Sequence, residues 1–180
     1  KRRGLDADAV QKFGIGYAAP RWDGLLERYG GSEDERHVLL RAGLIIERQP
    51  QQETSGATSS QSLERGFYDR FRDRIMFPIR SVQGEVIGFG GRVLDQGEPK
   101  YLNSPETPIF VKGRELYGLH EARSGLRQRG FALVVEGYMD VVALAQAGVG
   151  NVVAPLGTAC TAEHVQKLFR FTDSVVFSFD

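Results

Sequence analysis

The C-terminal part of the chain alternates between short apolar runs and helical segments, and this alternation constrains the fold more than any other feature. Runs rich in β-branched residues predict strands at 131–135, 151–154 and 174–179. The segments between them predict helices over roughly 138–147 and 161–170. Because a strand–helix–strand order requires crossover connections, the strands should be parallel and the helices should cover the sheet. We therefore predict an α/β region with a parallel sheet.

The sequence upstream of Arg129 has a different pattern. Short helices are predicted around "DADAVQKF", "WDGLLERY" and "SEDERHVLL", and Ser32 with Glu35 predicts a capping box for the third. The stretch "FYDRFRDRIMFPIRSVQGEVIGFGGRVL" is rich in strand-forming residues, and Gln83-Gly84 within it predicts a hairpin turn. These elements predict an α+β region of helices and a small mixed or antiparallel sheet.

Two features divide the chain. A polar stretch at about 49–63, rich in Gly, Ser, Thr and Gln, cannot bury a core and predicts a surface loop. The composition changes again near Arg129, so we expect one region at 1–128 and a second at 129–180. Because the chain stops at "SVVFSFD", directly on an acidic strand end, we also expect it to be a fragment of a longer protein.

Composition excludes several classes of function. Lys and Arg number 23, as do Asp and Glu, so a nucleic-acid partner must be recognised by local clusters rather than by bulk charge. One cysteine, Cys160, excludes an internal disulfide and a multi-cysteine zinc site. The histidines, His37, His120 and His164, have no metal-ligand spacing. No apolar run approaches the ~20 residues of a membrane span, so we expect a cytoplasmic protein without a membrane partner.

Acidic residues stand at the ends of two predicted strands. Glu136 follows "ALVV", Asp180 follows "VVFSF", and Asp140 lies one helical turn after Glu136. The carboxyl ends of parallel strands are where ligands bind, and carboxylate oxygens suit Mg²⁺, which usually shares its other positions with water and phosphates. The pattern indicates a metal-assisted phosphoryl or nucleotidyl transfer site. The alternative is that Glu136 and Asp140 only stabilise the N-terminus of the following helix.

The motifs "EGYMD" and "PLGTA", followed by a strand that ends in aspartate, resemble the Toprim segment of bacterial-type DNA primases. Upstream, "RFRDRIMFPIRSVQGEVIGFGGRVL" and "PKYLNSPETPIFVKGRELYGL" resemble the catalytic core of the same family. The resemblance implies an α+β N-terminal subdomain at 1–128 followed by a truncated Toprim domain at 129–180. It also implies that Glu136 and Asp180 bind Mg²⁺ or Mn²⁺, with Asp140 as a further catalytic residue. The second aspartate of the family's pair would be residue 182, beyond this chain.

The resemblance further implies a nucleotide- and template-binding set. Its members are polar or basic residues in the primase motifs: Arg92, Lys100, Asn103 and Lys112. Arg3, in the basic N-terminal segment, is a further candidate for binding phosphate. Lysine binds phosphate as a point charge, and arginine can bind it through two parallel hydrogen bonds. Because acidic residues interleave with these basic ones, a solvated surface is the alternative.

Three further arginines, Arg70, Arg72 and Arg74, alternate in "DRFRDR". In a strand they would share one face and could follow a nucleic-acid backbone, or they could pair with the neighbouring Asp69 and Asp73. Trp22 and the phenylalanines, by contrast, are expected in the core.

The function that the resemblance implies is a DNA primase, which joins ribonucleotides into short primers on single-stranded DNA by metal-dependent nucleotidyl transfer. The implied partners are the DNA template, nucleoside triphosphates, the RNA primer/DNA hybrid and, through a C-terminal region absent from this chain, the replicative helicase. Structural zinc is expected only in an N-terminal domain that this chain also lacks. We expect a bacterial cytoplasmic protein associated with the nucleoid, and expect the fragment alone to be inactive.

Two other kinds of Toprim protein are alternatives. A topoisomerase or nuclease would share the metal site, but a topoisomerase would need an active tyrosine that this sequence does not identify. A non-catalytic nucleic-acid-binding module of the recombination-mediator type would bring a zinc–cysteine cluster, for which one cysteine is too few.

Overall fold

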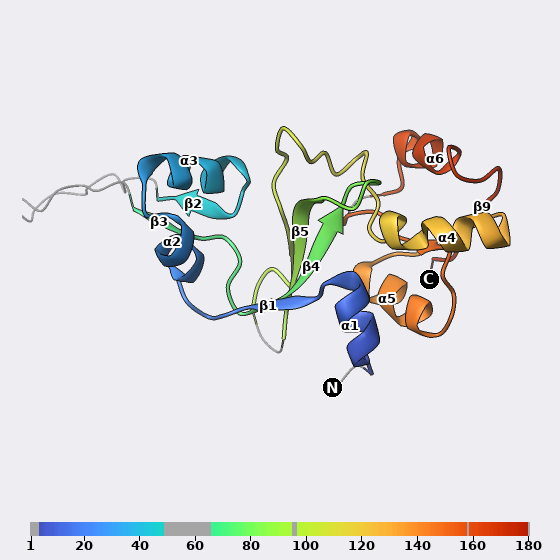
Figure 1. Cartoon of the computed structure of the whole chain (residues 1–180), viewed down its shortest axis with the longest axis horizontal. Helices are drawn as coiled ribbons and strands as arrows, with labels where there is room; N and C mark the ends of the chain where they lie inside the picture. Colours follow the sequence, from blue (N-terminus) through green and yellow to red (C-terminus); the bar gives the residue numbers. More distant parts are fainter. Residues whose placement is uncertain (1–3, 49–65, 95–96, 158, 180) are drawn as a thin grey trace, which may run out of the picture. The chain divides into compact units, whose positions relative to one another are not determined.

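The computed structural model describes residues 4–48, 66–94, 97–157 and 159–179. The chain forms two compact units (Figure 1). Unit 1 combines residues 1–17 with 74–180, and unit 2 comprises residues 18–73. Unit 1 carries the strand–helix alternation and most of the predicted site, so its architecture decides how the site is built.

The described part of unit 2 is a pair of helices with a two-stranded antiparallel ribbon. Its elements are α2 (Gly24–Tyr29), α3 (Glu33–Arg41), β2 (Ile45–Glu47) and β3 (Phe67–Asp69). The predicted capping box is confirmed, because the Ser32 hydroxyl accepts the Glu35 N–H at 3.2 Å and Glu35 accepts the Ser32 N–H at 2.9 Å. The buried carboxylate of Asp69 accepts the N–H groups of Leu25 and Leu26 at 2.6 and 3.1 Å, which fixes the start of α2.

Unit 1 begins with α1 (Ala7–Phe13) and an antiparallel sheet. The sheet has the order β1-β4-β5-β6, formed by β1 (Gly16–Ala18), β4 (Arg74–Arg80), β5 (Val86–Val93) and β6 (Tyr101–Asn103). β5 is antiparallel to both β4 and β6. The predicted hairpin turn is confirmed between β4 and β5, where Gly84 adopts φ +99°, a conformation that favours glycine.

The rest of unit 1 is the predicted α/β region. It contains α4 (Leu119–Arg129), β7 (Ala132–Val134), α5 (Tyr138–Gln146), β8 (Val152–Val153), α6 (Ala162–Leu168) and β9 (Val175–Phe177). The strand order is β8-β7-β9, and both outer strands are parallel to β7, which confirms the predicted parallel sheet. Within the described residues, no helix is both long and apolar enough to cross a bilayer.

The core of unit 1 joins the antiparallel sheet to the α/β region. One buried cluster brings together Phe13, Phe77, Tyr117 and Tyr138. Tyr138 packs so closely on β5 that a Cβ at Gly90 would lie 2.4 Å from its ring. Only glycine fits at position 90. The first residue of α5, which begins within the "EGYMD" motif, is therefore held directly against β5. A second cluster packs α4 and α6 on the parallel sheet.

Candidate catalytic and nucleic-acid-binding site

The carboxyl ends of β7 and β9 lie side by side. Val134 is in register with Phe177, and the N–H of Ser178 donates to the Val134 carbonyl at 2.9 Å. Glu136 follows β7 by two residues and is exposed to solvent. Asp180 follows β9 but lies outside the described residues. The convergence of the two carboxylates therefore stays a prediction, while the adjacency of the strands that carry them is observed.

Asp140 has a local partner at the start of α5. Its Oδ2 accepts the N–H of Gly137, the residue before the helix, at 3.1 Å. This is the reciprocal half of a capping box, in which an acidic residue at the third helical position satisfies a free donor at the N-terminus. The capping alternative thus holds for Asp140, whose catalytic role stays a prediction. The same bond fixes the turn that directly follows Glu136.

The donor chemistry at this edge suits a hard divalent cation. Glu136 is an exposed residue just beyond the end of β7. Among the described residues, no group of three or more His, Cys, Asp or Glu side chains could hold a metal ion. Mg²⁺ commonly binds one or two carboxylates and keeps water or phosphate oxygens in its other positions, so the exposed Glu136 carboxylate is chemically compatible with a role as a Mg²⁺ or Mn²⁺ ligand.

Arg92 lies on β5 opposite Tyr101 of β6. Its side chain is 5% exposed, and its guanidinium carbon lies 5.5 Å from the Tyr101 ring centroid. Its Nε has no hydrogen-bond partner within the described part of the chain. A buried guanidinium with an unused donor is costly unless a ligand or another group satisfies it, so the predicted phosphate-binding role is chemically reasonable here.

The two predicted lysines occupy loops that flank β6. Lys100 is exposed, and its carbonyl accepts the N–H of Val93 from β5 at 3.2 Å. Lys112 is half-buried, and its own N–H donates to Glu106 Oε1 at 3.1 Å. Both backbones are therefore fastened by hydrogen bonds.

Asn103 links three segments of unit 1. The Tyr138 hydroxyl donates to Asn103 Oδ1, and Asn103 Nδ2 donates to the Leu156 carbonyl at 2.9 Å. Burial raises the pKa of Tyr138 above its ordinary value, so its hydroxyl stays protonated and donates throughout the neutral range. Asn103 therefore ties β6 to the first residue of α5 and to the "PLGTA" segment. Direct ligand binding by Asn103 stays a prediction.

The arginine alternation does not form one strand face, so that expectation is wrong. β3 ends at Asp69 and β4 begins at Arg74, which leaves Arg70 and Arg72 outside strands. Partial burial lowers the pKa of Arg70. Arg74 is buried and donates to the Pro99 carbonyl at 2.8 Å. Asp69 could have paired with these arginines, but its carboxylate caps α2 instead. Arg3, the remaining basic candidate, lies outside the described residues.

Unit 2 carries an aromatic–cationic stack that the sequence alone did not reveal. The expectation that Trp22 is a core residue is wrong, because its side chain is 57% exposed. The guanidinium carbon of Arg72 lies 4.0 Å from the Trp22 ring centroid and 5.1 Å from that of Tyr68. Exposed aromatic rings beside arginine are suited to stacking with nucleic-acid bases. The only signal in the sequence was the turn-rich setting "PRWDG".

The phenylalanines divide between core and surface. Phe13, Phe77 and Phe110 are buried as expected. Phe169, Phe177 and Phe179 are exposed, so the expectation is wrong for them. Phe177 is the last residue of β9, and Phe179 lies two residues after it.

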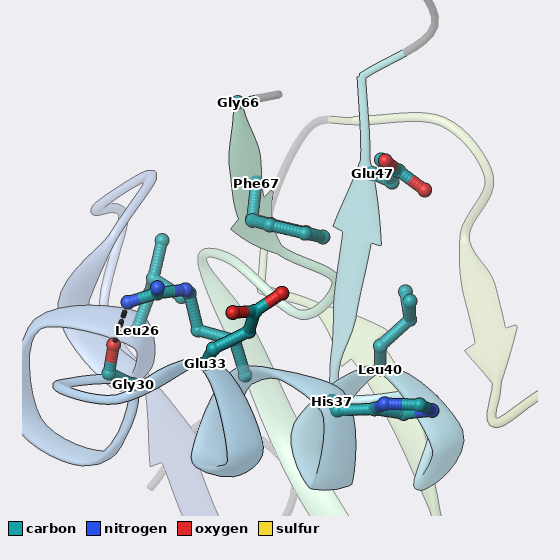
Figure 2. A pocket seen from close by; sticks show the side chains of 9 residues that line it. Leu26, Gly30, Glu33, His37, Leu40, Glu47, Gly66 and Phe67 are labelled. Carbon is teal, nitrogen blue, oxygen red and sulfur yellow. Dashed lines mark hydrogen bonds between the residues drawn. The ribbon is translucent and has the colours of Figure 1, made fainter. Parts of the chain in front are cut away.

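A pocket of about 870 Å³ lies in unit 2, among α2, α3 and the β2/β3 ribbon (Figure 2). Its walls mix apolar and charged side chains of both signs, and Arg36 donates to the Gly30 carbonyl at 2.8 Å. None of the predicted site residues lines it. The pocket therefore adds no group to the candidate site.

Comparisons with known proteins agree with the fold and its motifs. Residues 1–123 match the family described as the DNA primase catalytic core, N-terminal domain, and residues 130–180 match the Toprim domain. The chain is 52% identical to a DNA primase of Pseudomonas aeruginosa and 51% identical to one of Escherichia coli K12, each over all 180 residues. It spans 25% and 29%, respectively, of the lengths of those two relatives.

Solved structures give the same assignment. A DNA primase domain from Pseudomonas aeruginosa has a TM-score of 0.85 and 50% identity, covering 98% of this chain and 51% of that one. A DnaG primase catalytic domain bound to single-stranded DNA has a TM-score of 0.83 and 50% identity, with 98% and 50% coverage. The topoisomerase, nuclease and recombination-mediator alternatives are not favoured by these relatives. The chain belongs to the family of the DNA primase catalytic core, N-terminal domain, and continues into a Toprim segment.

Proposed function

We propose that this chain is part of a DNA primase that synthesises short RNA primers on single-stranded DNA. The observation that carries the proposal is that Glu136 is exposed two residues after β7, the strand whose carboxyl end pairs with that of β9. Its support is the identity of 52% to a named DNA primase over the whole chain. Since the chain spans a quarter of that relative, the activity is proposed for the full-length protein.

In this proposal Glu136 and Asp180 hold Mg²⁺ or Mn²⁺. The bound metal would lower the pKa of the primer hydroxyl and neutralise charge that develops on the phosphates. The chain's own contribution is positional. β7 and β9 bring the two carboxylate-bearing segments to one sheet edge, and Asp140 fixes the turn after Glu136 by accepting the Gly137 N–H.

The nucleic acid and nucleotides would bind through the basic set. Arg92, Lys100, Lys112 and Arg3 would hold phosphates, and Asn103 would organise the loops between them. A relative's catalytic domain has been solved with single-stranded DNA, which supports a DNA template as partner. Trp22, with Arg72 over its ring, would offer a stacking surface for a template base.

The remaining partners follow from the proposed activity. A primase would bind nucleoside triphosphates and the primer/DNA hybrid, and would meet the replicative helicase through a region outside this chain. Structural zinc would belong to another domain. We place the protein in the bacterial cytoplasm, with the replication machinery at the nucleoid.

The proposal is tested by template-dependent primer synthesis with the full-length protein carrying Glu136→Gln. Removing a metal-binding carboxylate should lower the rate by about 100-fold or more, as loss of a charge-stabilising group typically does. Glu85→Gln is the matched control, because Glu85 is an exposed acidic residue in the β4/β5 turn, remote in sequence from the acidic motif. A Glu136→Gln protein that is folded and makes primers at the wild-type rate would refute the proposal.

A further inference from the structure

His164 is the buried histidine of unit 1, and it lies in α6 with 0% exposure. Both of its ring nitrogens are used. The N–H of Thr161 contacts Nδ1 at 3.0 Å, and Nε2 lies 2.9 Å from the carbonyl oxygen of Lys112. Lys112 is 52 residues away along the chain, so the histidine connects a local helix cap to a distant loop.

The two partners determine the tautomer. A backbone N–H can only donate, so Nδ1 must accept from Thr161 and carry no proton. A carbonyl can only accept, so Nε2 must carry the proton and donate to Lys112. Neutral His164 therefore satisfies both partners at once.

His164 is the third residue of α6, and at this position the bond from its Nε2 to the Lys112 carbonyl is unusual. Thr161 and His164 form a capping box, in which the Thr161 hydroxyl also accepts the His164 N–H at 3.1 Å. Glutamate or glutamine normally occupies the third position of this motif. A glutamate would complete the cap but has no N–H to offer the Lys112 carbonyl. Histidine does both.

The loop that carries Lys112 is fastened to α6 at consecutive residues. The Thr161 hydroxyl donates to the Gly113 carbonyl at 2.7 Å. Lys167 Nζ donates to the Arg114 carbonyl at 3.0 Å and pairs with Glu115 at 2.5 Å. At Lys112 itself the N–H is bound by Glu106 and the carbonyl by His164, so side chains fix both of its backbone polar groups.

We propose that His164 is a positioning residue that fixes the backbone of Lys112 so that its ammonium is presented to a nucleic-acid phosphate. This rests on the proposed template- or nucleotide-binding role of Lys112. A long lysine side chain loses considerable freedom when it binds. Fixing its backbone beforehand removes part of the freedom that binding would otherwise have to restrict.

The test compares single and double variants of the full-length protein. His164→Asn is the informative change, because asparagine Oδ1 can replace Nδ1 and keep the cap, while its side chain is too short to reach the Lys112 carbonyl. Lys112→Gln removes the ammonium directly. Leu168→Ala is the control, because Leu168 is also buried in α6 but does not touch the loop through a hydrogen bond.

Binding of a labelled single-stranded oligothymidylate is measured by fluorescence anisotropy over a salt series. Losing one single-strand phosphate contact should weaken binding about fivefold at about 0.1 M salt and reduce the salt slope by about 0.7. We expect this from Lys112→Gln, most of it from His164→Asn, and no further loss in the double variant. Leu168→Ala should lower the melting temperature but leave the affinity unchanged in the folded protein.

Amide hydrogen exchange separates the inference from the proposed function. His164→Asn should speed exchange at Lys112, and Leu168→Ala should not. Unchanged exchange, wild-type affinity in His164→Asn, or additive losses in the double variant would overturn the positioning role. If Lys112→Gln alone binds DNA as the wild type does, the proposed role of Lys112 fails and the inference falls with it.

Discussion

The buried tyrosines Tyr117 and Tyr138 differ in the hydrogen bonding of their hydroxyl groups. Their rings pack edge to face, with centroids 4.8 Å apart, in the same cluster. The Tyr138 hydroxyl donates to Asn103, whereas the Tyr117 hydroxyl is buried and has no hydrogen-bond partner among the described residues. Burial raises the pKa of both phenols, so both are neutral at pH 7.

This contrast gives a paired prediction. Tyr138→Phe should lower the free energy of unfolding by about 1 kcal/mol, because it removes a hydrogen bond at a buried position. Tyr117→Phe should leave stability unchanged or raise it by up to about 1 kcal/mol, because it removes a buried hydroxyl that gains nothing. Urea unfolding of the two variants measures this difference. Equal destabilisation by both would contradict the hydrogen-bond assignment.

At the residue scale the sequence showed which residue types are present but not which residues they contact. The "EGYMD" motif around Glu136 and the amide of Asn103, which can donate and accept hydrogen bonds, can be recognised in the sequence. The link from His164 to Lys112 was not, because nothing local to either residue specifies a partner 52 positions away. Trp22 was misplaced for a similar reason. A tryptophan is usually buried, and only the tertiary structure shows that Arg72 and Tyr68 surround it at the surface.

At the element scale, the long periodic segments were predicted well. The helix expected over 138–147 is α5 (Tyr138–Gln146), and the one expected over 161–170 is α6 (Ala162–Leu168). Short elements were harder, since three residues contain too little alternation to be recognised. β6 (Tyr101–Asn103) lies in the stretch "DQGEPKYLNSPETPIF", whose prolines and polar residues are typical of a loop, and its pairing with β5 defines it as a strand.

The end of α4 is a sharper case. Either glycine of "LHEARSGLRQRG", Gly125 or Gly130, could end a helix, and the structure places the end at Gly130, where φ is +73°. Gly125 lies inside the helix for a packing reason. A Cβ there would lie 2.2 Å from the carbonyl oxygen of Gly150, just before β8. Neither backbone can move without displacing a buried element.

Gly125→Ala should therefore destabilise the protein although alanine is the better helix former. The helix gains about 1 kcal/mol in propensity, but the backbone clash should outweigh it and leave a net loss of about 1–3 kcal/mol. Ser124→Ala, at the exposed neighbouring position, is the control and should be neutral or slightly stabilising. Thermal unfolding compares the two. A stabilised Gly125→Ala protein would show that α4 does not approach β8 so closely.

At the scale of the whole molecule, the fold class could be predicted from the sequence because each region has its own pattern of apolar and polar residues. Alternating strands and helices predicted the parallel sheet, and the hairpin signal predicted the antiparallel one. The division at 128/129 stays a prediction. A shared core could not be foreseen, because it depends on Tyr138 reaching across to Phe77 and to the glycine at position 90.

The shared core also explains how the residues of the candidate site are brought into one unit. Glu136 follows β7 of the parallel sheet. Arg92 lies in β5, Asn103 lies in β6, and Lys100 lies in the loop between these two strands. Tyr138 lies two residues after Glu136 and packs on β5, so Glu136 and the candidate basic residues Arg92, Lys100 and Asn103 belong to one compact unit. A site of this kind suits a reaction that depends on positioning phosphates beside a metal.

The most direct test of the account is Mn²⁺ binding to the full-length protein, measured by electron paramagnetic resonance. If Glu136 and Asp180 share a divalent ion, Glu136→Gln and Asp180→Asn should each weaken Mn²⁺ binding, while Glu85→Gln should bind as the wild type does. If both site variants are folded and bind Mn²⁺ with wild-type affinity, the metal does not lie at this edge of the sheet.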